Sequence, residues 1–140
     1  MLNITEKLDT TLTNVGLLVL RAVFGLLLAF GHGWGKLSHF SEMAANFADP
    51  FGFGGPFSLG LTVFAEFFCA LAVALGILAR VATLPLIIMF LTVVLIIHGD
   101  DPWPRQEMGL MYLIVFVTVL LTGPGKYSLD NMIFKWKQPK

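Results

Sequence analysis

The sequence is poor in the residues on which disulfide-stabilised proteins and soluble domains depend. It contains one cysteine, Cys69, so a disulfide framework and a cysteine zinc cluster are both excluded within one chain. Charged residues make up 13% of the 140 residues, against about 25% in a soluble domain. The sequence has no glycine-rich phosphate loop and no basic patch, so we expect no nucleic-acid partner.

Long apolar stretches stand where charges are missing. Hydrophobic residues make up 56% of the chain, and the mean hydropathy is +0.81. A helix that crosses the hydrocarbon core of a bilayer needs about 20 mostly apolar residues. The apolar stretches predict an all-α protein, a bundle of four transmembrane helices at about 15–36, 57–79, 81–98 and 105–122. Membrane lipid is therefore its first expected partner.

A soluble bundle and a cleaved signal peptide are the alternatives to this topology. A soluble bundle needs polar outer faces on its helices, and residues 84–97 offer only Thr92. A signal peptide begins with a basic segment, whereas residues 1–14 contain Glu6 and Asp9 beside Lys7. We therefore expect the first helix to be retained as a membrane span.

The distribution of lysine and arginine predicts the orientation of the chain in the membrane. With four spans, both termini share one side with the connection between the second and third helices. The opposite side holds Lys36 and Arg105. Because cytoplasmic loops are rich in basic residues, we expect both termini in the cytoplasm of a bacterium, below its inner membrane, and a short interfacial segment at 127–137. The basic residues on the predicted cytoplasmic side are Lys7, Arg21, Arg80, Lys126, Lys135, Lys137 and Lys140.

Ionisable residues inside the predicted spans are candidates for function, because the bilayer makes an unpaired charge costly. Arg21 lies in the cytoplasmic half of the first predicted helix, and Glu66 lies near the middle of the second. We predict that Arg21 and Glu66 form an intramembrane ion pair or proton site; a purely structural pair is the alternative. Gly31 and Gly35, four residues apart, predict the close approach of a neighbouring helix.

A second polar group is predicted at the outer end of the bundle. Its two histidines, His32 and His98, lie on different predicted helices and are candidate ligands for a metal or haem. Glu107 has the alternative role of a favourable negative charge at a helix N-terminus. Cys69 is either a core residue or a redox thiol that lacks a second cysteine. The predicted outer cluster consists of His32, Lys36, His98, Asp100, Asp101, Arg105 and Glu107.

Three segments resemble the DoxX family of membrane proteins. Gly31–Leu37 is similar to the family's segment at the end of the first helix, and Glu66 with Ala70–Arg80 resembles its second-helix pattern. Leu121–Asp130, with the sequence Leu-Thr-Gly-Pro-Gly-Lys-Tyr-Ser-Leu-Asp, resembles its closing signature. The sequence departs from the family at Ala79, where threonine is common.

The resemblance covers nearly the whole chain, from about Val15 to Met132, and implies a four-helix protein of the inner membrane. Members of the family include, or are similar to, the small subunit of thiosulfate:quinone oxidoreductase. His32 and His98 do not belong to the family's pattern, so any role for them is particular to this chain or a subgroup.

Three functions stay open at this point. The first is a membrane subunit of an oxidoreductase system that contacts quinone; the chain has no evident redox centre, so we do not expect catalysis by this chain alone. The second is a scaffold or assembly factor, which predicts a filled bundle. The third is metal or solute handling, which predicts that His32 and His98 converge on one point. Glycine and alanine faces on several helices also suit a homo-oligomer.

Overall fold

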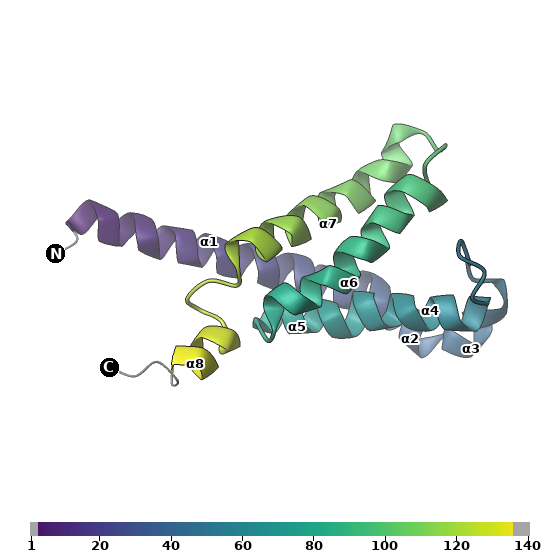
Figure 1. Ribbon diagram of the computed structural model, residues 1–140, viewed down its shortest axis with the longest axis horizontal. Coiled ribbons are helices and arrows are strands. Elements are labelled where there is room, and N and C mark those ends of the chain that lie inside the picture. Colours follow the sequence, from purple (N-terminus) through teal and green to yellow (C-terminus); the bar gives the residue numbers. More distant parts are fainter. Residues whose placement is uncertain (1–2, 136–140) are drawn as a thin grey trace.

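The computed structural model describes residues 3–135 and contains helices but no strand in that range (Figure 1). This confirms the all-α prediction. Four helical stretches are long and apolar enough to cross a membrane: Ile4–Ser38, Gly55–Leu75, Ala79–Ile97 and Trp103–Thr122. The prediction of four transmembrane helices is therefore confirmed. The last described helix, α8 (Leu129–Lys135), covers part of the predicted interfacial segment, and residues 136 and 137 of that segment lie outside the described range.

The first span begins well before the apolar stretch that predicted it. It consists of α1 (Ile4–Leu28), the π-helix η1 (Ala29–Gly33) and α2 (Trp34–Ser38). A capping box starts it: the Asn3 side chain accepts from the Glu6 amide, and the Glu6 carboxylate accepts from the Asn3 amide. At 1.5 Å per residue the rod is about 50 Å long, whereas the hydrocarbon core is about 30 Å thick. Its first turns therefore project beyond the bundle, as Figure 1 shows.

The second span ends at a sharp turn. It consists of α4 (Gly55–Val63), the π-helix η3 (Phe64–Cys69) and α5 (Ala70–Leu75). The prediction extended it to residue 79, but Gly76 adopts a left-handed conformation with φ of 74°, which ends the helix. The third span, α6 (Ala79–Thr92) with the π-helix η4 (Val93–Ile97), starts directly after this turn. The fourth span is α7 (Trp103–Thr122).

The spans form two antiparallel pairs that diverge toward one end of the molecule. The first pair is α1–η1–α2 with α4–η3–α5, and the second pair is α6–η4 with α7. Figure 1 shows that the pairs meet near the α5–α6 turn and separate toward the connection between α6 and α7. We call the end with the separated tips, where residues 39–54 and 98–102 lie, the loop end. The opposite end, with the α5–α6 turn and residues 123–128, is the termini end.

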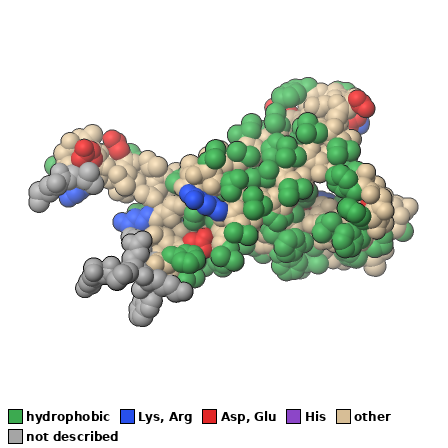
Figure 2. Space-filling view, viewed as in Figure 1, with side chains coloured by type: hydrophobic (Ala, Val, Ile, Leu, Met, Phe, Trp, Pro, Cys, Tyr) green, Lys and Arg blue, Asp and Glu red, His purple; other side chains and the backbone are tan. Residues whose placement is uncertain are grey.

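The core lies where the two pairs meet. Phe90 stacks on Tyr112 with ring centroids 5.2 Å apart, and Phe24 of α1 meets the edge of Tyr112 at 5.7 Å. Outside this core the helices present large apolar side chains, such as Ile88 and Leu95, which are 65% and 68% exposed. Figure 2 shows hydrophobic side chains over the helical middle and charged side chains toward the ends. An apolar surface of this kind is the one that a bilayer covers.

The loop between the first two spans is held by one carboxylate. It contains the short helix α3 (Phe40–Met43) and the 3-10 turn η2 (Ala44–Asn46). Asp49 accepts hydrogen bonds from Ser58 Oγ at 2.7 Å, the Gly54 amide at 2.7 Å and the Phe53 amide at 3.0 Å. These bonds, the one from Ser58 above all, lower the pKa of Asp49 below its usual 3.8. The part of the loop that contains Phe51 and Phe53 is therefore ordered.

Candidate functional site

Arg21 and Glu66 do not pair, and the predicted ion pair is wrong. Arg21 is 1% exposed, and within residues 3–135 its guanidinium donates only to main-chain carbonyls. Nε donates to the Pro124 carbonyl at 2.9 Å, and Nη2 donates to that of Tyr127. Nη1 donates to the carbonyls of Val73, at 3.4 Å, and Ala74. Arg21 thus binds α5 and residues 124–127 to α1, and its side chain is enclosed by the protein.

Helix direction explains why Arg21 turns away from Glu66. The Cα–Cβ bonds of an α-helix tilt toward its N-terminus, so Arg21 leans toward the termini end. A Cβ atom on Gly33 would lie 2.8 Å from the Glu66 backbone, so Gly33 marks the level of Glu66 on the first span. Arg21 precedes Gly33 by twelve residues, which is about 18 Å along the helix. This separation is too large for the pair.

Lys36 is the partner of Glu66. The Lys36 Nζ atom lies 2.6 Å from Glu66 Oε2, and Glu66 is 7% exposed. The two side chains lean toward each other, because the first span runs toward the loop end and the second runs away from it. Lys36 was expected in the outer cluster and Glu66 in the ion pair, so the structure joins residues of two predicted groups. The tilt of Cα–Cβ bonds on antiparallel helices is the sequence signal that favours this pair over Arg21.

Glycines let the first two spans approach closely at Glu66. A Cβ atom on Gly25 would lie 2.7 Å from the Ala70 carbonyl oxygen, and one on Gly33 would collide with the Glu66 backbone. A Cβ atom on Gly31 or Gly35, by contrast, would meet nothing within 4 Å. The predicted contact of Gly31 and Gly35 is therefore wrong: the packed glycines lie on the neighbouring face of the same helix. The close approach brings η1 and η3 together beside the Lys36–Glu66 pair.

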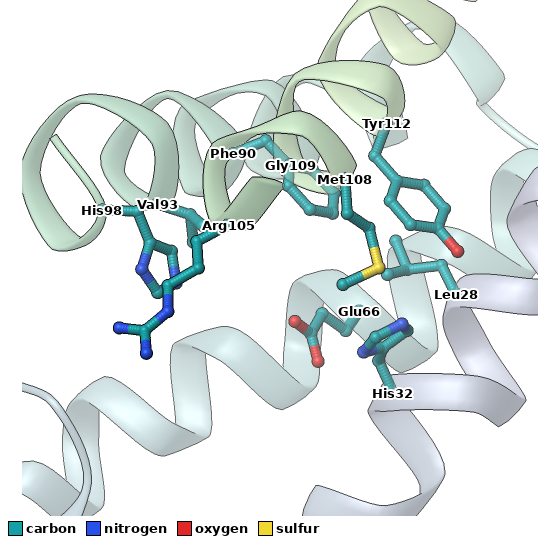
Figure 3. A pocket seen from close by; sticks show the side chains of 10 residues that line it. All are labelled: Leu28, His32, Glu66, Phe90, Val93, His98, Arg105, Met108, Gly109 and Tyr112. Carbon is teal, nitrogen blue, oxygen red and sulfur yellow. The ribbon is translucent and has the colours of Figure 1, made fainter. Parts of the chain in front are cut away.

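A cavity of about 120 Å³ lies between the two helix pairs, next to Glu66. Figure 3 shows Glu66 and His32 on one side of it and His98 with Arg105 on the other. Figure 2 shows the hollow between the separated pairs. Three of its lining residues, His32, Glu66 and Val93, lie on the π-helices η1, η3 and η4. π-Helical turns are rare in proteins, and those that occur are often found at functional sites. The convergence of three of them therefore marks this cavity as the candidate site. Its other lining residues are Leu28, Phe90, His98, Arg105, Met108, Gly109 and Tyr112.

Tyr112 is a wall of the cavity that sequence reasoning missed. Its ring packs between Phe24 and Phe90, and the His32 ring meets its edge at a centroid distance of 6.1 Å. A tyrosine in an apolar stretch of α7 gives no signal of its own, because only packing against α1 and α6 brings it to Glu66.

His98, Asp101 and Arg105 form a polar group at the loop end of the cavity. His98 Nδ1 lies 2.6 Å from Asp101 Oδ2, and Arg105 Nη1 lies 3.6 Å from the same oxygen. Gln106 fixes the turn by donating to the main-chain carbonyls of Asp101 at 2.9 Å and Gly99 at 3.2 Å. The hydrogen bond with His98, followed by the charge of Arg105, lowers the pKa of Asp101. The loop between α6 and α7 thus presents an ordered histidine–carboxylate pair to the cavity.

The structure brings five members of the predicted outer cluster to this region and leaves two outside it. His32, His98 and Arg105 line the cavity, Lys36 pairs with its wall, and Asp101 holds His98. Asp100 and Glu107 are exposed and form no ion pair with another described residue. Glu107 does not start its helix as expected, because α7 begins at Trp103.

The expected metal or haem pair gains no support from the geometry. His32 and His98 lie on opposite sides of the cavity in Figure 3. Within the described residues, no group of three or more His, Cys, Asp or Glu side chains is arranged to hold a metal ion. Cys69 is buried in the core and also lines an apolar depression of about 250 Å³ beside Phe64, Phe68 and Pro85. That depression has no charged residue to orient a ligand.

Comparison with known proteins agrees with the fold. The model of the DoxX family matches residues 16–99, from early in the first span to the end of the third. The chain is 28% identical to the inner membrane protein YqjF of Escherichia coli (strain K12) over 128 residues, which are 89% of this chain and 96% of that protein. No solved structure matches the chain. The family match ends before Leu121–Asp130, so the resemblance of that segment stays a prediction.

Proposed function

Because the chain belongs to the DoxX family, we propose that it is a membrane subunit that binds a quinone head group for an oxidoreductase partner, in the cavity beside Glu66 and Lys36. It is a multi-pass protein of the inner membrane, so an isoprenoid quinone reaches it directly from the bilayer. The observation that carries the proposal is a buried Lys36–Glu66 pair at the wall of a cavity between two separated helix pairs.

The size of the cavity suits a single six-membered ring. An apolar cavity of about 150 Å³ binds benzene, and the cavity here measures about 120 Å³. Leu28, Phe90 and Met108 supply apolar contacts for a ring, and Glu66 and His32 supply polar groups for its oxygen atoms. The hollow between the helix pairs leaves room for a tail (Figure 2). This mixture of an apolar wall and a few polar groups is typical of small-molecule sites.

The chemistry of a quinone explains why charged side chains are retained at this depth. Its reduction takes up two electrons and two protons, so a site needs ionisable groups close to the quinone oxygens. Glu66, Lys36 and His32 are such groups. The electrons come from the redox centre of the partner, which reduces the quinone while this chain binds and protonates it. A pure scaffold predicts a filled bundle and does not need an open cavity beside the pair.

Equilibrium binding tests the proposal. The protein is placed in lipid nanodiscs and titrated with decylubiquinone and with a short-tailed menaquinone analogue, with binding followed by quenching of tryptophan fluorescence. Glu66→Gln is expected to weaken binding at least about tenfold, since a hydrogen bond to a charged group contributes about 1.5–3 kcal/mol. Glu42→Gln, which changes an exposed glutamate of α3 in the same way, is the matched control. Equal affinities of the two variants, or no binding by the unaltered protein, contradict the proposal.

Cytoplasmic termini are part of the same proposal. The excess of lysine and arginine at the termini end supports it. In a Cys69→Ala background, a membrane-impermeant maleimide added to intact cells is expected to label Ser41→Cys in the loop-end connection. Thr5→Cys in the first turns of α1 is expected to react only after lysis. Labelling of Thr5→Cys in intact cells overturns the orientation, whereas the quinone titration gives its result whichever way the chain is inserted.

A further inference from the structure

His98 connects the cavity with the water at the loop end. Its ring lines the cavity, while its side chain is 35% exposed and belongs to the short connection between α6 and α7. Among the other polar side chains of the cavity wall, Glu66 is only 7% exposed, whereas the Arg105 side chain is 70% exposed but keeps its proton in proteins. His98 is thus a titratable group placed to touch both a ligand and solvent.

We propose that His98, held by Asp101, carries protons between the water at the loop end and the quinone head group in the cavity. The inference rests on the proposed function and adds to it the side from which protons enter. Asp101 is a positioning residue in this scheme, because it acts through His98 and does not line the cavity.

The hydrogen bond with Asp101 fixes the form of the His98 ring. Asp101 Oδ2 lies 2.6 Å from His98 Nδ1, so the carboxylate accepts and Nδ1 carries a hydrogen. In the neutral ring Nε2 then has a free lone pair, and in the charged ring Nε2 donates. His98 can therefore take a proton from water and give it from the same nitrogen atom, without rotating away from Asp101.

Charged and titratable groups on every neighbouring element set the field at His98. On its own connection and on α7, the near ones are Asp101, which attracts a proton to the ring, and Arg105, which opposes it. The Glu66 charge across the cavity is already paired with Lys36. The other charged or titratable side chains of the cavity lining are His32, Glu66, Arg105 and Tyr112. Lys36 lies behind Glu66 as its ion-pair partner, and Asp100 and Glu107 are exposed outside the lining.

The transfer balances as a proton-coupled reduction. The quinone receives two electrons from the reduced centre of the partner, and its two carbonyl oxygens become hydroxyl groups. The oxygen that faces His98 takes one proton from His98 Nε2, and the oxygen on the opposite side of the cavity takes the other proton from the Lys36 ammonium beside Glu66. Water then returns one proton to each donor. The ring of the quinone becomes aromatic, and His98 ends in its starting form.

Reduction of bound quinone in nanodiscs tests the inference. The protein is loaded with decylubiquinone, dithionite supplies the electrons, and stopped-flow absorbance follows the loss of quinone between pH 6 and pH 9. At saturating quinone, His98→Ala is expected to reduce it about a hundredfold more slowly at pH 8, the lower limit for loss of a general acid. Added imidazole is expected to restore the rate. Asp101→Asn is expected to slow the reaction less and to shift its pH profile.

His39→Ala is the matched control, because His39 is an exposed histidine of the loop end outside the cavity lining. Equal rates in His98→Ala and His39→Ala overturn the inference, as does a slower rate that imidazole does not restore. Either result leaves the proposed function intact if quinone still binds and Glu66→Gln still weakens it. Failure of the unaltered protein to bind quinone removes the proposed function itself, so the two failures are distinguishable.

Discussion

Arg21 on the first span and Glu66 on the second are both charged and both buried, yet their surroundings differ. The Arg21 guanidinium is surrounded by four main-chain carbonyls from α5 and residues 124–127. Glu66 has one strong partner, Lys36, and faces a cavity. The first centre is closed by the backbone, whereas the second leaves one side open to a ligand.

The difference teaches how to separate a structural charge from a functional one in a membrane protein. A buried charge whose hydrogen-bonding capacity is filled by the backbone stabilises the fold and has nothing left to offer. A buried charge with one mobile partner and an adjacent cavity can exchange that partner for a ligand. An ionisable residue within a span suggests a function in both cases. Only its surroundings show whether the charge is structural or functional.

Loss of the Arg21 side chain gives the largest expected effect. Arg21→Met removes a donor from four main-chain carbonyls, of which that of Val73 keeps the Gly76 amide, at a cost of about 1–3 kcal/mol for each buried one that stays unsatisfied. We expect little folded protein in the membrane, measured as the monodisperse fraction after detergent extraction. Arg21→Lys, which keeps the charge and three donors, is expected to recover part of the yield. A normal yield of Arg21→Met argues that the two centres are alike.

A double-mutant cycle measures the open centre. Lys36→Met leaves the Glu66 carboxylate buried without a partner, which costs about 3 kcal/mol, the lower limit for breaking a buried pair. Lys36→Met combined with Glu66→Gln is expected to recover most of that loss, because no charge is left behind. The free energy of unfolding is measured by titrating the protein, after its extraction from nanodiscs, with sodium dodecyl sulfate. Strict additivity of the two changes contradicts a direct pair.

Close packing beside Glu66 gives a smaller effect. Gly33→Ala places a Cβ atom 2.8 Å from the Glu66 backbone and is expected to lower the free energy of unfolding by about 1–3 kcal/mol. Gly31→Ala lies two residues away with nothing within 4 Å, and we expect it to be neutral or slightly stabilising. Thermal melting of the two variants side by side is the measurement. Equal melting temperatures mean that the two spans are not in close contact at Gly33.

Protonation of Asp49, which lies far from both centres, has the smallest expected effect on stability. The pKa of Asp49 is lower in the folded chain than its usual 3.8, so its hydrogen bonds stabilise the fold above pH 3.8 and are lost as the pH falls through the lowered value. We expect a slight drop in melting temperature of the unaltered protein in that range, and a smaller drop in Asp49→Asn. Asp9→Asn, an exposed change on α1, is the control. The same acid response in both variants contradicts a role for Asp49.

The sequence predicted the spans correctly but not the start of the first helix or the partner of Glu66. Apolar length identified all four spans, because the bilayer imposes a minimum on every crossing segment. It missed the start of α1, since polar residues 4–14 continue the helix through a capping box at Asn3 and not through hydrophobicity. It also named most polar residues of the cavity and yet assigned Glu66 the wrong partner.

Composition by itself determined that this chain crosses the membrane as helices and that a few ionisable residues stand at unusual depth. Which of those residues meet was decided only by the tertiary structure. The long connection from His39 to Gly54 leaves the offset between the first two spans open, and Gly25 and Gly33 then fix it through close contact with the second span. That offset directs Arg21 to the backbone of the termini end and Lys36 to Glu66, since contacts between helices depend on register as well as on residue type.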